Sequence, residues 1–179
     1  MRKQPSQTIN QLDAKEARWF AVYTNYKREK LVEKRLTQKG IECYLPIQKV
    51  VKQWSKKRRT MELPLISCYI FVKITLKNYV PVLETDYVLK FIKFSKDLIA
   101  IPEEEILFLK NLLEEDIEFE VEAAPPLQKG DRVEITTGSL AGTKGRLIET
   151  TGKNRVLITL EHIQHTFSLS VEKHLIQKV

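Results

Sequence analysis

The chain has 179 residues, of which 42% are hydrophobic and 30% are charged, with 6 Gly and 7 Pro. This composition excludes a disordered, fibrous or disulfide-rich protein, and the length allows one large domain or two small ones. The longest apolar run, around 65–72, is far shorter than the roughly 20 residues that span a bilayer. The polar segment 1–18 fits no signal peptide, so we expect a cytoplasmic protein with no membrane partner.

Charge is segregated along the chain. The net charge is +7, and six of the eleven residues in 49–59 are basic with no acid among them. By contrast, 103–122 carries nine acidic residues and only Lys110 as a base. A polyanion partner is therefore plausible and the basic surface local, although charge alone does not choose among DNA, RNA and membrane.

The cysteines and histidines do not form the pattern of a catalytic or metal-binding site. Cys43 and Cys68 lie far apart within apolar stretches, which predicts reduced core thiols. His162, His165 and His174 have no Cys or carboxylate partners at ligand spacing, which predicts surface histidines. We therefore expect no metal and no cofactor.

The first half alternates strands and helices. Segment 1–17 is polar without periodicity and predicts a flexible tail. Aromatic and β-branched residues predict a strand over 19–25, after which Thr24 or Asn25 can cap a helix that ends at Gly40.

Next, a period of two predicts a strand over 41–54 and a second strand that begins near Thr60. The tip of this hairpin is then basic, with Lys56, Lys57, Arg58 and Arg59. The apolar continuation to residue 74 directs alternate side chains to opposite faces. One face receives Ile70, Val72 and Ile74, and the other, which no predicted helix covers, receives Tyr69 and Phe71.

A short helix over 77–84, a strand over 87–95 and a helix after Pro102 follow. This order predicts an α+β fold of the split βαβ kind, with one antiparallel sheet backed by helices, over 18–118. The pattern breaks at the Pro125–Pro126 pair, so we expect a linker over 119–126. Short, evenly spaced strands over 127–179 predict a small β-barrel.

The stretch ITTGSLAGTKGRLIE over 135–149 raises the question of a phosphate-binding loop. Its glycines follow no buried parallel strand and precede no helix, and Lys144 does not stand before Ser or Thr. The glycines are better explained by positive φ angles in a turn and by close backbone approach.

The same stretch resembles the KOW motif of small SH3-like barrels. The matching residues are Gly138, Ala141, Gly142 and Gly145, followed by a hydrophobic strand. KOW motifs also occur in ribosomal and other RNA-binding proteins, so the motif alone favours RNA binding.

The N-terminal half resembles the N-terminal domain of NusG-type transcription elongation factors. The residues that carry this resemblance are RWFAVYTNYKREKLVEKRLTQKGIECYLP, the basic hairpin and LPLISCYIFVKI. With the KOW motif, it covers about 18–179. Its length and divergent strand motif look more like the specialised antiterminator paralogs of the RfaH and UpxY types than like the housekeeping factor.

The resemblance implies roles for individual residues. Tyr69 and Phe71, with Phe94 on the neighbouring strand, would contact the clamp helices of the largest subunit of RNA polymerase. Ordinary core packing or a dimer face are the alternatives for these rings. Lys27 and Arg28 would contact the displaced non-template DNA strand. The hairpin cations would reach upstream duplex or polymerase, or form a solvated charge run.

Two departures from the family leave points open. Ser67–Cys68 stands where the family has Pro-Gly or Pro-Asn, and EHIQH over 161–165 replaces a Phe-Gly-Arg hairpin. Contact of the KOW domain with the termination factor Rho or the ribosome is therefore open. Some specialised members hold this domain in a helical form, but its period of two and its Val, Ile and Thr content predict strands.

The resulting expectation is a monomeric, non-enzymatic antitermination and processivity factor that suppresses pausing at specific long operons, such as those for polysaccharide biosynthesis. The alternative is an RNA-binding or ribosome-associated KOW protein. An enzyme with a nucleotide site at the glycines is the weakest reading.

Overall fold

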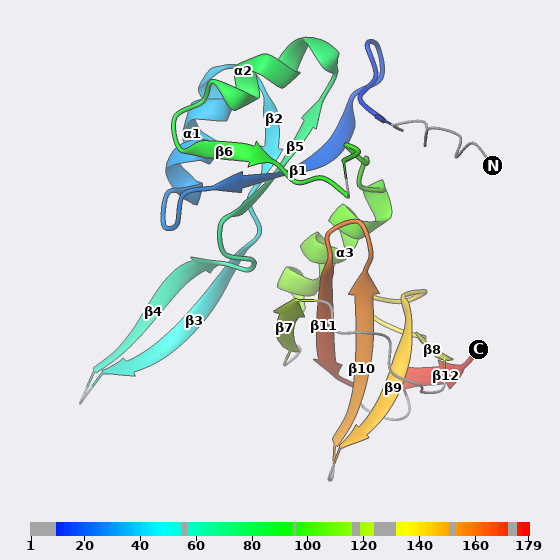
Figure 1. The fold of residues 1–179 in the computed structure, drawn as a ribbon. Helices are drawn as coiled ribbons and strands as arrows, with labels where there is room; N and C mark the ends of the chain where they lie inside the picture. Colours follow the sequence, from blue (N-terminus) through cyan, green and yellow to red (C-terminus); the bar gives the residue numbers. More distant parts are fainter. Residues whose placement is uncertain are drawn as a thin grey trace, which may run out of the picture. The chain divides into compact units, whose positions relative to one another are not determined.

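The chain forms two compact units, Met1–Pro102 and Glu103–Val179. The computed structural model describes residues 10–54, 57–94, 96–115, 119–123, 132–150, 153–171 and 175–179 (Figure 1). The predicted boundary between the domains, a linker over 119–126, lies after helix α3 (Glu103–Glu114). The boundary between the two units lies before this helix, which groups with the second unit. The contacts of α3 with the strands of that unit, described below, are the physical reason.

An antiparallel sheet forms the centre of the first unit. Its strands are β1 (Arg18–Thr24), β2 (Glu42–Tyr44), β5 (Tyr69–Ile74) and β6 (Val88–Phe91), in the order β2-β5-β1-β6. β1 pairs with both β5 and β6. The predicted α+β fold with an antiparallel sheet is confirmed.

Helices cover one face of this sheet (Figure 1). They are α1 (Glu29–Gln38), the 3-10 helix η1 (Leu76–Asn78) and α2 (Tyr79–Leu83). Val32 and Leu36 of α1 and Val82 of α2 are fully buried against the apolar side chains of the sheet. Ile70, Val72 and Ile74 belong to the same core, as the alternation along β5 predicted.

Helix α1 begins later than the sequence suggested. Its N-cap is Arg28, without a side-chain cap, so the prediction of a Thr24 or Asn25 cap is wrong. The Asn25 carbonyl instead accepts a hydrogen bond from the Arg28 N–H at 3.1 Å, which makes a turn before the helix. Lys27 within this turn has φ 61°, in the left-handed region.

Strands β3 (Ile47–Trp54) and β4 (Lys57–Pro64) form a separate two-stranded arm that extends from the sheet (Figure 1). The single strand expected over 41–54 is broken, because the chain leaves the sheet after β2. The continuous strand expected up to residue 74 also ends, at Pro64. Lys57, Arg58 and Arg59 therefore lie within β4, not in a loop at the tip, and Lys56 lies outside the described residues.

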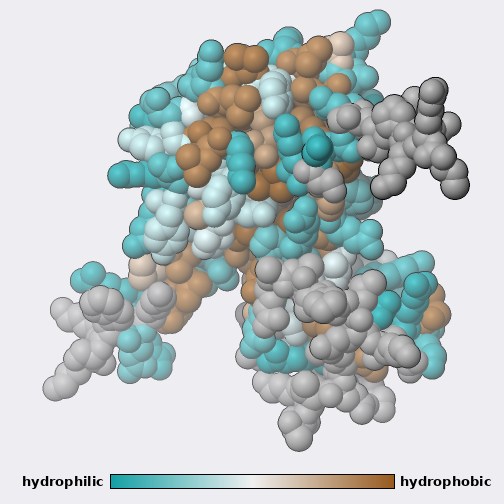
Figure 2. Space-filling model, in the orientation of Figure 1, coloured by the Kyte–Doolittle hydropathy of each residue, from teal (hydrophilic) through white to brown (hydrophobic). Residues whose placement is uncertain are grey.

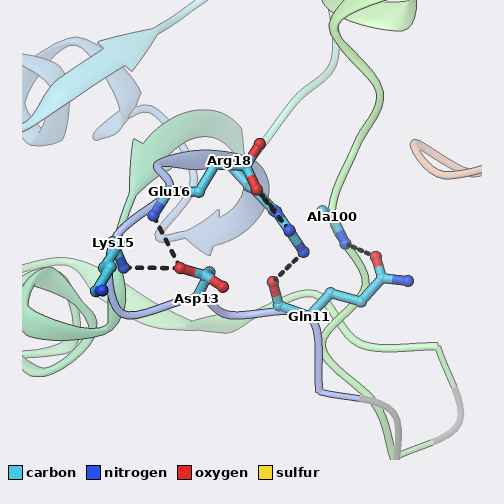
Figure 3. Close-up of polar contacts among 6 residues, drawn as sticks. All are labelled: Gln11, Asp13, Lys15, Glu16, Arg18 and Ala100. Carbon is cyan, nitrogen blue, oxygen red and sulfur yellow. Dashed lines mark hydrogen bonds and ion pairs between the residues drawn. The ribbon is translucent and has the colours of Figure 1, made fainter.

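Residues 10–17, the described part of the predicted flexible tail over 1–17, are anchored by hydrogen bonds, and residues 1–9 lie outside the described residues. The Gln11 N–H donates to the Leu98 carbonyl at 2.9 Å. Gln11 Oε1 accepts from the Ala100 N–H at 2.8 Å (Figure 3). Asp13 Oδ1 accepts the N–H groups of Lys15 and Glu16. These bonds lower the pKa of the Asp13 carboxyl, because they favour its charged form.

Strands make up most of the second unit. They are β7 (Phe119–Ala123), β8 (Arg132–Ile135), β9 (Lys144–Thr150), β10 (Lys153–Leu160), β11 (His165–Ser170) and β12 (Ile176–Lys178). They form one antiparallel sheet in the order β12-β8-β9-β10-β11-β7. The part of 127–179 that the structure describes holds no α-helix, in line with the predicted strands. β7 comes from the segment predicted as a linker and pairs with β11.

Both ends of α3 are attached to this sheet by polar contacts. Glu105 Oε1 lies 2.7 Å from His162 Nδ1, and Glu105 Oε2 accepts the Ile163 N–H at 3.2 Å. At the other end, Glu115 Oε1 accepts hydrogen bonds from the Ser139 hydroxyl at 2.6 Å and N–H at 2.7 Å. His162 thus lies in the turn between β10 and β11 as a partner of α3, instead of on a strand surface.

An aromatic contact fixes the middle of α3. The rings of Phe108 and Phe167 meet edge to face, with centroids 5.4 Å apart, and both residues are buried. Ile106, Leu109 and Leu112 are also buried, so α3 contributes a full apolar stripe. No helix among the described residues is long and apolar enough to cross a membrane.

We expect Phe108→Ala to lower the free energy of unfolding of the second unit by about 3–5 kcal/mol, because it leaves a cavity beside Phe167. The adjacent Leu107 is 53% exposed, so Leu107→Ala is the matched control and should change stability little. Denaturation of the full chain followed by circular dichroism measures both. Equal stabilities of the two variants would contradict the packing of α3 on this sheet.

Candidate functional site

Aromatic side chains gather on the face of the first sheet opposite to the helices. Tyr69 and Phe71 share this face of β5, as predicted, and their register partners supply further rings. Tyr23 of β1 pairs with Tyr69, and their rings meet edge to face at 5.9 Å. Tyr44 of β2 pairs with Phe71, and these rings stack at 6.4 Å. We call Tyr23, Tyr44, Tyr69 and Phe71 the aromatic face.

The exposure of these rings corrects the sequence prediction. Tyr23, Tyr44 and Tyr69 are half-buried, but Phe71 is completely buried. The expectation that Phe71 lies on an uncovered surface is therefore wrong, and the stacked Tyr44 is one cause. Burial raises the pKa of the Tyr69 phenol, so this ring stays neutral at physiological pH. A partner of this face would therefore contact the partly exposed tyrosines and not Phe71.

Phe94 does not lie where the sequence placed it. β6 ends at Phe91, and Phe94 belongs to an isolated bridge with Asp97 beyond the strand. The structure therefore does not place Phe94 on the strand next to the aromatic face. Its polymerase-binding role stays a prediction.

Two lysines flank the aromatic face. Lys73 Nζ lies 5.6 Å from the ring centroid of Trp19, and Lys90 Nζ lies 6.0 Å from that of Tyr23. Both distances are typical of cation–π contacts. Sequence reasoning missed Tyr23 and Tyr44, although the alternation in 19–25 and the pairing of neighbouring strands could have placed them on this face.

The turn that leads into β5 depends on a buried carboxylate. Glu29, in the first turn of α1, is 3% exposed, and its Oε1 accepts the Cys68 N–H at 2.8 Å. The Cys68 carbonyl accepts the Thr24 N–H at 2.8 Å, which joins the turn to the end of β1. Cys68 has φ 65°, a conformation that favours glycine or asparagine.

The loop between β1 and α1 carries the predicted nucleic-acid contacts Lys27 and Arg28. Both side chains are exposed, and no carboxylate of the described residues pairs with either. The Arg28 guanidinium lies 5.2 Å from the ring centroid of Tyr87, at the start of β6. These positive charges are therefore available to an external anion.

The hairpin arm presents a second set of cations. Arg58 and Arg59 of β4 are exposed. Lys30 Nζ of α1 lies 2.9 Å from Glu62 Oε2 of β4, and this contact lowers the pKa of the Glu62 carboxyl. The ion pair links the arm to α1, while Arg58 and Arg59 lie nearer the tip of the hairpin, at the beginning of β4.

An exposed apolar group lies on the helix side, away from the aromatic face. Figure 2 shows hydrophobic surface in the region of α2. The exposed residues there are Leu76, Val80 and Leu83. Leu76 belongs to η1, and Val80 and Leu83 belong to α2.

The cysteines and histidines form no reactive centre in the described part of the chain. Cys43 and Cys68 are both free, and burial raises the pKa of the Cys43 thiol, which keeps it protonated. His165 Nδ1 lies 2.8 Å from the Ile163 carbonyl oxygen. The described residues contain no group of three or more His, Cys, Asp or Glu that could hold a metal ion.

The glycines of the 135–149 stretch serve backbone geometry. Gly138 has φ 78° and Gly142 has φ 85°, and the Gly142 N–H donates to the Ile135 carbonyl at 2.8 Å. A Cβ atom at Gly145 would lie only 2.6 Å from the Leu157 carbonyl oxygen. Ala141 is exposed in the turn. The stretch thus connects β8 to β9 and is followed by no helix.

Comparison with known proteins agrees with this architecture. The family described as "Transcription termination factor nusG" matches residues 17–110, more than half of the chain. No curated protein matches. A solved structure described as "Domain interaction in Thermotoga maritima NusG" shares 20% identity and a TM-score of 0.58, over 93% of this chain and 99% of that one.

Two further structures, described as the MjSpt4:Spt5 complex in conformations A and B, share 22% and 20% identity with this chain. The matches cover 90% of this chain in both cases and 97% and 96% of those chains, each with a TM-score of 0.30.

We expect Cys68→Gly to raise the free energy of unfolding of the first unit by about 0.5–1 kcal/mol, because glycine adopts the left-handed conformation without strain. Cys43→Gly, in strand β2, is the matched control and should lower it. Both tryptophans of the chain, Trp19 and Trp54, belong to the first unit, so their fluorescence follows its denaturation. A destabilised Cys68→Gly variant would contradict this account of the turn.

For the second unit, Gly145→Ala should lower the free energy of unfolding by about 1–3 kcal/mol, because the new methyl group collides with β10. Ala141→Ser, on the exposed side of the same turn, should have little effect. Circular dichroism of the full chain during denaturation reports both changes. Unchanged stability of Gly145→Ala would mean that β9 and β10 are farther apart than described.

Proposed function

This chain belongs to the NusG family of non-enzymatic transcription factors, and we propose that it is an antitermination and processivity factor that binds elongating RNA polymerase. The observation that carries the proposal is the aromatic face, which lies opposite to the helices within the segment that matches the family. Members of this family bind RNA polymerase and partner proteins. The proposal extends that property to particular residues of this chain.

The aromatic face has the chemistry of a protein interface. Tyr23, Tyr44 and Tyr69 are half-buried, so each presents apolar ring surface together with a hydroxyl group. Tyrosine is enriched among the residues that dominate binding energy, because its rigid ring loses little conformational entropy. Phe71 is buried, and its ring stacks with that of Tyr44. We assign the clamp helices of the largest polymerase subunit as the partner of this face.

Polymerase binding can suppress pausing only through a difference in affinity. The factor must bind the elongating conformation more tightly than the paused one, since equal affinity for both would shift no population. The first unit offers two kinds of contact for this purpose. The aromatic face would hold one part of the polymerase, and the hairpin arm would reach another.

Nucleic acid is the second proposed partner. Exposed Lys27 and Arg28 would contact phosphates of the displaced non-template DNA strand. Arg58 and Arg59, together with Lys56 and Lys57, would contact upstream duplex or polymerase from the hairpin arm. Arginine and lysine neutralise phosphates at the cost of salt-sensitive binding, so these contacts should weaken as ionic strength rises.

The wider setting follows from the same proposal. The factor would act in the cytoplasm as a monomer, at specific long operons such as those for polysaccharide biosynthesis. The KOW segment would form the second module, through which contact with Rho or the ribosome is proposed. Because the matched family is described as a termination factor, the transcription assay below also measures the direction of the effect.

The test uses purified RNA polymerase and the full chain. We expect Tyr23→Ala combined with Tyr69→Ala to weaken polymerase capture by roughly tenfold or more, because both rings lie on the aromatic face. Leu76→Ala, on the helix side and 55% exposed, is the control and should bind normally. Circular dichroism verifies that each variant is folded. In transcription assays, the same pair of substitutions should remove read-through of pauses and terminators.

The alternative reading predicts a different pattern. If the tyrosine variant still captures polymerase while Arg58→Ala with Arg59→Ala abolishes RNA binding, the chain is an RNA-binding or ribosome-associated protein. The proposal would then fail.

A further inference from the structure

Tyr26 is an exposed aromatic residue whose position no fold requirement explains. Its side chain is 66% exposed, in the loop between β1 and α1. Phe20 and Phe91, in the neighbouring strands, are buried in the core. A large ring that remains in solvent on an ordered loop is available to stack against a flat ligand.

The backbone holds this loop in a defined conformation. The Asn25 N–H donates to the Tyr87 carbonyl at 2.9 Å, which fixes the loop to the start of β6. Lys27 and Tyr87 both have positive φ angles, 61° and 72°. Such strained residues persist where surrounding structure holds them, and they cluster at binding sites. The loop therefore presents Tyr26 without a further ordering step.

One cation lies against the Tyr26 ring, and two more lie against the ring of Tyr87, whose carbonyl binds the same loop. Lys27 Nζ lies 5.2 Å from the centroid of the Tyr26 ring. The guanidinium groups of Arg28 and Arg35 lie 5.2 Å and 4.9 Å from the centroid of the Tyr87 ring. Aromatic rings interleaved with Lys and Arg are typical of surfaces that bind single strands, because rings stack on bases while cations contact phosphates.

Asp86, the acidic residue next to Tyr87, does not neutralise Lys27 or Arg28. Asp86 Oδ2 lies 2.9 Å from Arg35 Nη1, so its charge is opposed by Arg35. Lys30, the next cation along α1, is paired with Glu62. Lys27 and Arg28 thus remain the cations that can meet an incoming phosphate next to Tyr26.

We propose that Tyr26 stacks on an unpaired base of a single-stranded nucleic acid, whose adjacent phosphates contact Lys27 and Arg28. This inference rests on the proposed function, in which Lys27 and Arg28 contact phosphates, and adds a stacking contact with a base. A duplex would not satisfy the site, because its bases are already stacked on each other. An acidic peptide would use the cations but leave the ring without a flat partner.

The first test measures binding of fluorescent single-stranded DNA and RNA oligonucleotides to the full chain by anisotropy, with duplex DNA as the comparison. Tyr26→Ala should weaken single-strand binding by about tenfold, and Tyr26→Phe, which keeps the ring, should bind normally. Leu76→Ala and Lys77→Ala, exposed on η1, control for general surface changes. The DNA and RNA arms identify which strand the site prefers.

A second measurement isolates stacking from charge. Oligonucleotides with one abasic position should bind the wild type more weakly at the position that meets Tyr26, while Tyr26→Ala should show no such loss at any position. Lys27→Ala with Arg28→Ala should reduce the salt dependence of binding but keep the sensitivity to the abasic position. Wild-type affinity of Tyr26→Ala, equal affinity for duplex, or failure of the wild type to bind single strands would overturn the stacking proposal.

Polymerase capture separates this proposal from the proposed function. Tyr26→Ala should capture polymerase like the wild type, because Tyr26 lies outside the aromatic face. If capture persists and stacking fails, only the further inference is lost. If the Tyr23 and Tyr69 variant captures polymerase normally while Tyr26→Ala loses oligonucleotide binding, the proposed function fails and the nucleic-acid site remains.

Discussion

The antiparallel register between β1 and β5 is the constraint on which the first unit depends. Val22 pairs with Ile70, and both belong to the core beneath the helices. Tyr23 pairs with Tyr69, which places both rings on the opposite side. A slip of one residue would exchange these two sets and expose the core positions to solvent. Burial of the core therefore fixes the aromatic face as well, without any separate contribution from the tyrosines.

The irregular backbone of the unit is concentrated at the end of β1. Lys27, Cys68 and Tyr87 all have positive φ angles, although none is glycine. The carbonyl groups of Cys68 and Tyr87 accept hydrogen bonds from the N–H groups of Thr24 and Asn25. The end of β1 thus anchors the entries of both neighbouring strands. These backbone hydrogen bonds hold the three residues in their strained conformations. The exposed loop with Lys27 and Arg28 also begins at the end of β1.

Period-two patterns predicted the faces of β5 and the strands of the second unit, because alternation records burial directly. The burial of Phe71 could not be predicted in this way, since alternation gives the face of a residue but not what packs on it, such as the ring of Tyr44 from a strand distant in sequence. The sequence also did not predict that α3 belongs to the second unit, because an apolar stripe shows that a helix packs against something but not which sheet it packs on. Tyr26 was overlooked beside Lys27, since a single aromatic residue in a polar loop has no periodicity.

The central place of β1 in its sheet has a consequence for synthesis on the ribosome. Both partners of β1 come later in the chain, so this strand emerges from the ribosome with neither of them available. Helix α1, β2 and the whole hairpin arm must be translated before Tyr69 can meet Tyr23. Closing such a loop is entropically unfavourable and slow compared with forming the local hairpin. During synthesis the apolar β1 segment should therefore need to be shielded from aggregation, for example by a chaperone, until β5 has left the exit tunnel.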